Sequence, residues 1–145
     1  MHIRRRTAAL AATAGIVAGS VAGLAAPALA DGTATCSASQ VCLYFDSGQS
    51  GAHLGFYWNV SDYDRDSDNN GAYWTFPNNG DGAGHRVKNN VASARNLDSA
   101  CRVRIYYNEN FNASGAAPYQ DLSPGNYGNL SAAMVNNNAS QQWFC

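Results

Sequence analysis

The chain has 145 residues, a length that fits one domain with a single hydrophobic core. Its nine Lys and Arg residues nearly balance ten Asp and Glu residues, but three of the arginines, Arg4, Arg5 and Arg6, stand together near the N-terminus. The rest of the chain has six basic and ten acidic side chains, a net charge of −4, with one lysine and no basic cluster. This distribution argues against nucleic acid as a partner, because binding to phosphates requires clustered positive charge.

The first 30 residues have the three parts of a secretory signal peptide. The arginines form the positive start, an apolar Ala- and Gly-rich stretch follows over residues 8–24, and Ala28-Leu29-Ala30 supplies a small-x-small cleavage site. The alternative, a retained membrane anchor, is disfavoured because the stretch is only weakly apolar, and no later segment has the roughly 18 apolar residues of a membrane span. We predict that residues 1–30 are removed and that residues 31–145 form a secreted domain without membrane contact.

All four cysteines lie in the predicted mature chain, namely Cys36, Cys42, Cys101 and Cys145. An even number of cysteines in an exported chain indicates two disulfides. Of the three pairings, we expect Cys36–Cys42, a tight local loop, and Cys101–Cys145, which ties the C-terminal residue to the second half. The chain-entropy model gives about 4 kcal/mol for the long loop and about 2 kcal/mol for the short one.

The mature chain alternates short apolar or aromatic runs with clusters of Gly, Asn, Ser and Asp. In chain order, the predicted strands cover residues 41–45, 53–58, 72–76 and 103–107. Asn70-Gly71 and Asn79-Gly80 are the strongest turn signals. Since no amphipathic helix interrupts the pattern, we predict an all-β sandwich or barrel.

A two-fold internal repeat runs through these segments. Its two hairpin segments read aromatic-x₄-Gln49-x-Gly51 from Tyr44 and aromatic-x₄-Phe111-x-Ala113 from Tyr106. Each half then reaches the pattern Asn-Asn-x-x-Ser, at residues 89–93 and 136–140. The interval from Tyr44 to Asn89 is 45 residues, against 30 from Tyr106 to Asn136, and we assign the excess to the polar stretch 61–84.

This repeat resembles the βγ-crystallin Greek key, two of which form one domain. The resemblance implies a single βγ-crystallin-like sandwich of two Greek-key units, at about 41–94 and 103–142. The pattern departs from the family where Gln49 replaces an aromatic residue, where Ala113 replaces a glycine, and where Ala94 and Gln141 replace the final serines. An exported, two-disulfide domain with Cys-x₅-Cys at its start is also similar to the actinobacterial (Streptomyces-type) metalloproteinase-inhibitor family of peptidase inhibitors.

The resemblance also implies calcium sites that combine groups from both halves. Carried over to this sequence, the ligands are Asn89, Ser93, Asn136 and Ser140. Amide and hydroxyl oxygens are suitable calcium ligands, but the absence of carboxylates predicts weak binding. The alternative is that these side chains satisfy the backbone of turns.

A second acidic segment has a weaker calcium signal. Residues 66–71 match the first six positions of a calcium loop, but Pro77 stands where the bidentate Glu is required. We therefore expect this segment, with Asp62 and Asp64, to form a solvated insertion.

No motif supports catalysis, so we predict that the protein is not an enzyme. The resemblance implies a secreted monomer that binds and inhibits an extracellular protease. Tyr73, Trp74 and Phe76 are the candidate protease-binding surface, although they equally fit a strand packed in the core. The alternatives are a calcium-binding structural or stress module of the cell exterior and a small secreted antimicrobial toxin.

Overall fold

The computed structural model describes residues 34–65 and 71–145, which form seven strands and one short 3₁₀ turn. The elements are β1 (Val41–Asp46), β2 (Ser50–Phe56), β3 (Ser93–Asn96), β4 (Arg102–Tyr106), η2 (Asn110–Asn112), β5 (Tyr119–Leu122), β6 (Tyr127–Asn129) and β7 (Ser140–Phe144). The predicted signal peptide and most of the calcium-loop-like segment 66–71 lie outside the described residues. Within them, no helix is long and apolar enough to cross a membrane.

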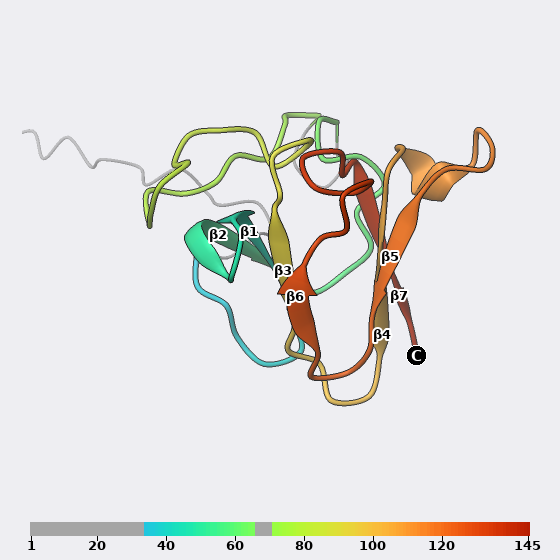
Figure 1. The fold of residues 1–145 in the computed structure, drawn as a ribbon, viewed down its shortest axis with the longest axis horizontal. Helices are drawn as coiled ribbons and strands as arrows, with labels where there is room; N and C mark the ends of the chain where they lie inside the picture. Colours follow the sequence, from blue (N-terminus) through green and yellow to red (C-terminus); the bar gives the residue numbers. More distant parts are fainter. Residues whose placement is uncertain (1–33, 66–70) are drawn as a thin grey trace, which may run out of the picture.

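The strands form two antiparallel sheets (Figure 1). One sheet has the order β2-β1-β3-β6 and the other the order β5-β4-β7. Strand β6 belongs to the second half of the chain but pairs with β3 of the first, while Val60 of the first half bridges Gln141 of β7. Each half thus lends a segment to the sheet of the other, and the predicted all-β sandwich is confirmed.

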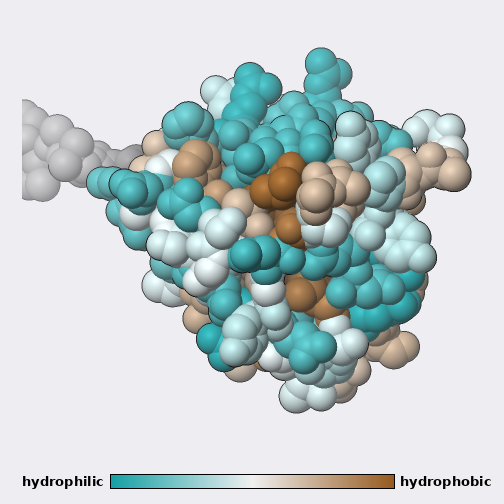
Figure 2. All heavy atoms as spheres, viewed as in Figure 1, coloured by the Kyte–Doolittle hydropathy of each residue, from teal (hydrophilic) through white to brown (hydrophobic). Residues whose placement is uncertain are grey.

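Alternation of side chains explains why these segments form a sandwich. In β4, Val103 and Ile105 are fully buried whereas Arg102 and Arg104 point outward, so one face joins the core and the other faces solvent. The molecular face in Figure 2 is accordingly mostly hydrophilic, with apolar side chains gathered in a narrow central strip.

The insertion of the first half packs onto the core. The Trp74 ring lies edge-on to Phe56 with a centroid distance of 5.1 Å, and the backbone N–H of Trp74 donates to the Tyr63 carbonyl (2.8 Å). Trp74 and Phe76 are 5% and 1% exposed, so the prediction that they form an exposed binding surface is wrong and their core alternative is confirmed. Asp62 is also buried, so the expectation of a solvated insertion fails there too. Residues 72–76 do not form the predicted regular strand; Thr75 and Arg86 form an isolated β-bridge, and the backbones of Trp74 and Phe76 make further hydrogen bonds.

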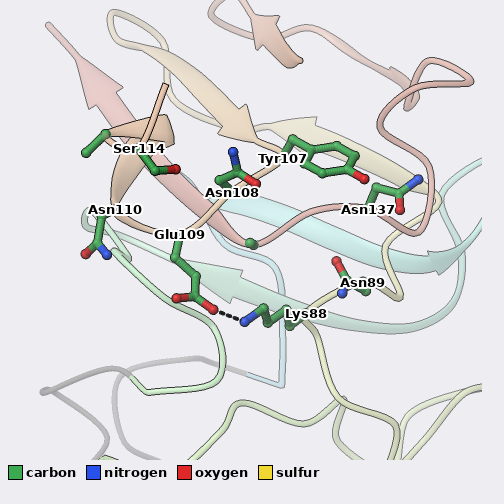
Figure 3. Close-up of a pocket in the computed structure, with 10 residues that line it drawn as sticks. Lys88, Asn89, Tyr107, Asn108, Glu109, Asn110, Ser114 and Asn137 are labelled. Atoms are coloured by element: carbon green, nitrogen blue, oxygen red, sulfur yellow. Dashed lines mark hydrogen bonds and ion pairs between the residues drawn. The ribbon is translucent and has the colours of Figure 1, made fainter. Parts of the chain in front are cut away.

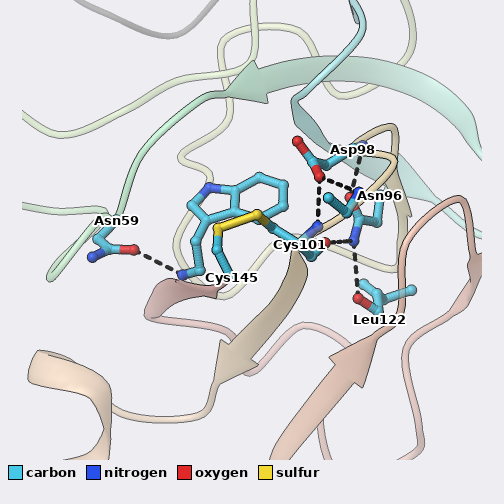
Figure 4. The surroundings of a disulfide bond; sticks show 8 residues. Asn59, Asn96, Asp98, Cys101, Leu122 and Cys145 are labelled. Carbon is cyan, nitrogen blue, oxygen red and sulfur yellow. Dashed lines mark hydrogen bonds between the residues drawn. A yellow bond between two sulfur atoms is a disulfide. The ribbon is translucent and has the colours of Figure 1, made fainter.

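Both predicted disulfides, Cys36–Cys42 and Cys101–Cys145, are present. The second joins the start of β4 to the end of the chain beside β7, and its surroundings are tightly hydrogen-bonded (Figure 4). The Asn96 amide donates to the carbonyls of Cys101 (2.8 Å) and Leu122 (3.0 Å). Backbone N–H groups of Cys101 and Ala100 donate to the Asp98 carboxylate and lower its pKa. Two disulfides indicate an oxidising compartment.

Candidate functional site

The two serines predicted as calcium ligands each close a hairpin. Ser93 Oγ donates to the Asp46 carbonyl (2.6 Å) and accepts from the Gln49 N–H (2.9 Å). Ser140 Oγ makes the equivalent pair, donating to the Asn108 carbonyl (2.7 Å) and accepting from the Phe111 N–H (3.2 Å). Each buried hydroxyl therefore already donates one hydrogen bond and accepts another.

The two predicted asparagines lie where the halves meet. Asn89 and Asn136 both have left-handed backbones, with φ of 59° and 54°, a conformation that asparagine tolerates better than most residues. The Asn89 N–H donates to the Asn138 carbonyl (2.8 Å), and the Asn136 N–H donates to the Val91 carbonyl (3.0 Å). These reciprocal bonds show the two-fold repeat in the backbone itself.

Asn89 borders a pocket of about 400 Å³ between the two halves (Figure 3). The pocket lies between the Asn89 segment and the chain that follows β4, and its lining includes Asn108, whose carbonyl accepts from Ser140. The structure therefore brings Asn89 near the hairpin that Ser140 closes. In the parts of the chain that are described, no group of three His, Cys, Asp or Glu residues could hold a metal ion.

Lys88 places a positive charge in this pocket. Its ammonium group contacts a carboxylate oxygen of Glu109, and lies 3.3 Å from Asp64 Oδ2 and 3.6 Å from Asp62 Oδ1. The Lys88 and Glu109 side chains point toward each other from opposite walls (Figure 3). Burial would lower the pKa of Lys88, but the hydrogen bond to Glu109 and the charges of Asp62 and Asp64 outweigh it and raise the pKa.

Residues 107–118, here called the β4–β5 loop, project from the sandwich (Figure 1). The equivalent connection between β1 and β2 spans only residues 47–49. Residues 113–116 at the tip are exposed and read Ala-Ser-Gly-Ala. Long loops on a compact scaffold are where binding residues concentrate.

The base of the β4–β5 loop is held by the Asn112 side chain. Asn112 Oδ1 accepts from the Asn108 N–H (2.8 Å), and Nδ2 donates to the carbonyls of Ala117 (3.0 Å) and Pro118 (3.1 Å). One amide thus spans the loop from its first residues to its last. No motif in the sequence predicts this clamp, although the run of small residues that ends at Pro118 is typical of a loop.

Two further contacts fix the start of the loop. The Asn110 N–H donates to the Ser61 carbonyl (2.7 Å), and the Phe111 ring packs on Tyr106 at a centroid distance of 5.8 Å. Asn110, Phe111 and Asn112 all have left-handed backbones, with φ between 50° and 61°. Such consecutive unfavourable conformations persist only where surrounding contacts impose them.

A charged and aromatic platform lies beside the loop on the outer face of the second sheet. Arg104 forms a bidentate ion pair with Asp121, with N···O distances of 2.7 and 2.8 Å. Its guanidinium also stacks on the Tyr119 ring, 3.7 Å from the ring centroid. The hydrogen bond from Arg104 lowers the pKa of Asp121. A groove of about 280 Å³ separates these side chains from the loop residues Phe111, Asn112 and 115–117.

Comparison with known proteins identifies the fold. No protein-family model and no curated protein matches the chain. Among solved structures, one described as "Evolution of the eye lens beta-gamma-crystallin domain fold" superposes with a TM-score of 0.53 and 13% identity, over 77% of this chain and 91% of that chain. The protein therefore has the βγ-crystallin domain fold, as predicted, with two disulfides. A likeness at this identity describes the fold alone.

Proposed function

We propose that the protein is a secreted binding module that inhibits an extracellular protease by inserting the β4–β5 loop into the enzyme's substrate cleft. The observation that carries this proposal is an exposed loop whose conformation is fixed at its base. A loop that is already ordered loses little conformational entropy on binding, so more of the contact energy becomes affinity.

The tip composition indicates which enzymes fit. Ala113, Ser114 and Ala116 have small side chains, and none of the tip residues is aromatic or charged. A protease with a shallow pocket for small side chains can accept this tip, whereas one that needs a large or charged anchor gains nothing from it.

The scaffold suits the role of an inhibitor that survives among proteases. The Asn112 clamp and the hydrogen bond from Asn110 to Ser61 hold the loop ends, and two disulfides tie the sandwich. Slow local unfolding protects a bound loop from cleavage, because proteolysis requires a segment to open.

An inhibition panel tests the proposal. The mature chain, residues 31–145 with its disulfides formed, would be titrated against thermolysin-like, subtilisin-like and elastase-like enzymes. We expect inhibition of at least one enzyme that prefers small residues, and a loss of at least about tenfold in affinity for Ala116→Arg, since a bulky charge cannot enter a shallow pocket.

Ala100→Arg supplies the matched control, because Ala100 is also exposed but lies in the distant β3–β4 connection. It should inhibit as the wild type does. Full activity of every enzyme at micromolar excess of the wild-type protein would refute the proposal.

A further inference from the structure

We propose that the ammonium group of Lys88 takes the place of a bound cation between the two halves, so that the protein is stable without calcium. This inference concerns the Asn89 pocket and does not depend on protease inhibition.

The residues implied as calcium ligands do not fit calcium well in this structure. Ser140 Oγ already donates to Asn108 and accepts from Phe111, and the neighbouring carboxylate, Glu109, is in contact with Lys88. Calcium needs six to eight oxygen ligands. A divalent ion entering the pocket beside Asn89 would also meet the fixed positive charge of Lys88.

Lys88 does what a structural cation does, because it joins carboxylates from separate segments. Asp62 and Asp64 belong to the insertion of the first half, whereas Glu109 begins the β4–β5 loop of the second. The Lys88 side chain is 17% exposed and Asp62 12%, so this contact is largely shielded from water, whereas Glu109 is 44% exposed. Without it, three carboxylates would lie close together, and the remaining ion pair that the described residues give them is the one between Asp64 and the exposed Arg86, at 3.5 Å.

The symmetry-related junction between the halves, around Asn136 and the β1–β2 hairpin, lacks this arrangement. Lys88 precedes Asn89 as Val135 precedes Asn136, and Glu109 follows Tyr106 by three residues as Ser47 follows Tyr44. The corresponding hairpin of the first half carries Asp46 at the position of Asn108, but no lysine stands opposite it. The contact of Lys88 with Glu109 is therefore specific to the pocket that abuts the long loop, which indicates a role in fastening that loop to the first half.

Thermal melting with calcium or chelator tests the inference. The melting temperature of the wild type should be unchanged between millimolar Ca²⁺ and excess chelator. In Lys88→Met it should fall by about 5 to 10 °C, because three carboxylates then repel one another. Millimolar Ca²⁺ should leave that loss unchanged, because no group of acidic side chains in the described residues is arranged to hold the ion.

Two further variants keep the test decisive if Lys88→Met does not fold. Glu109→Gln should lower the melting temperature by a smaller amount that calcium does not restore, because a contact and a carboxylate are both lost. Arg86→Gln, at an exposed position, should behave as the wild type. Calcium stabilisation of the wild type, or a Lys88→Met or Glu109→Gln protein as stable as the wild type, would overturn the inference.

Discussion

Asn112 shows how one side chain can prepare a loop for binding. Its amide makes three hydrogen bonds across the base of the β4–β5 loop, in a backbone conformation with φ of 61°. Asn112→Ala should lower the free energy of unfolding by about 1 to 3 kcal/mol, through the lost bonds and the poorer fit of alanine to this conformation.

The larger effect of Asn112→Ala should appear in the loop itself. Limited proteolysis followed by mass spectrometry should detect new cleavage within residues 113–117. Asn78→Ala, at an exposed position of the first half, is the control and should leave the cleavage pattern unchanged. An Asn112→Ala loop as resistant as that of the wild type would contradict the clamp.

Asp121 gives the protein a defined response to acid. Arg104 lowers the pKa of Asp121 in the folded protein below its ordinary value of 3.8. The ion pair therefore stabilises the fold fully at pH values above 3.8, and this stabilisation is lost as the pH falls through the pKa that Asp121 has in the folded protein. The stability difference between the wild type and Asp121→Asn should therefore be largest near neutral pH and shrink as the pH falls below about 4. Melting temperatures measured across this range check the prediction, and a difference independent of pH would contradict it.

At the scale of the elements, the two hairpins use the same closure in both halves. Ser93 and Ser140 are fully buried, and each joins an N–H and a carbonyl of its own hairpin. Ser93→Ala and Ser140→Ala should each reduce the free energy of unfolding by about 1 to 3 kcal/mol, since buried backbone groups lose their partners. Urea denaturation measures both losses, and a negligible effect in either variant would show that its hydroxyl is not needed for closure.

The insertion of the first half contributes to the core rather than to a binding surface. Trp74→Ala should lower the free energy of unfolding by about 3 to 5 kcal/mol, as expected for a buried aromatic residue. Tyr73→Ala is the matched comparison, because the neighbouring Tyr73 is 49% exposed, with the Arg86 guanidinium 4.3 Å from its ring centroid. Urea denaturation should separate the two variants clearly, and equal losses would contradict the packing described.

The sequence predicted the elements whose apolar pattern is strong and missed those without one. Strands β1, β2 and β4 were foreseen from their apolar runs, whereas β6 reads only Tyr-Gly-Asn and is defined by pairing with β3. Such a short segment carries no local signal, because its register depends on a distant strand. The disulfide pairing was predicted correctly. Cys36 and Cys42 are close together in the chain, and Cys101 and Cys145 both lie in the second half.

The candidate site was harder to predict from the sequence, because its contacts also depend on residues that are distant in the chain. The Asn-Asn-x-x-Ser elements were found as a repeat, but their hydrogen bonds to the opposite half depend on how the two halves meet. The contact of Lys88 with Glu109 joins residues from different halves, and neither residue belongs to a recognisable motif. Long-range contacts of this kind follow from topology rather than from neighbours in the chain.

At the scale of the whole molecule, the protein is a two-sheet scaffold whose halves are alike in some features and different in others. The repeat makes the halves alike in their hairpin closures and in the reciprocal Asn89 and Asn136 bonds, whereas the β4–β5 loop and the Lys88 cluster occur on one side only. Because the fold does not require the long β4–β5 loop, we assign the binding function to that loop.

The most direct test of this account is to shorten the loop while keeping the scaffold. Residues 113–116 would be replaced by two glycines, leaving the Asn112 clamp and Glu109 in place. Inhibition by this variant would be measured beside its melting temperature. We predict a melting temperature close to that of the wild type together with complete loss of protease inhibition. A folded, loop-shortened protein that inhibits as strongly as the wild type would contradict the assignment of the β4–β5 loop as the binding element.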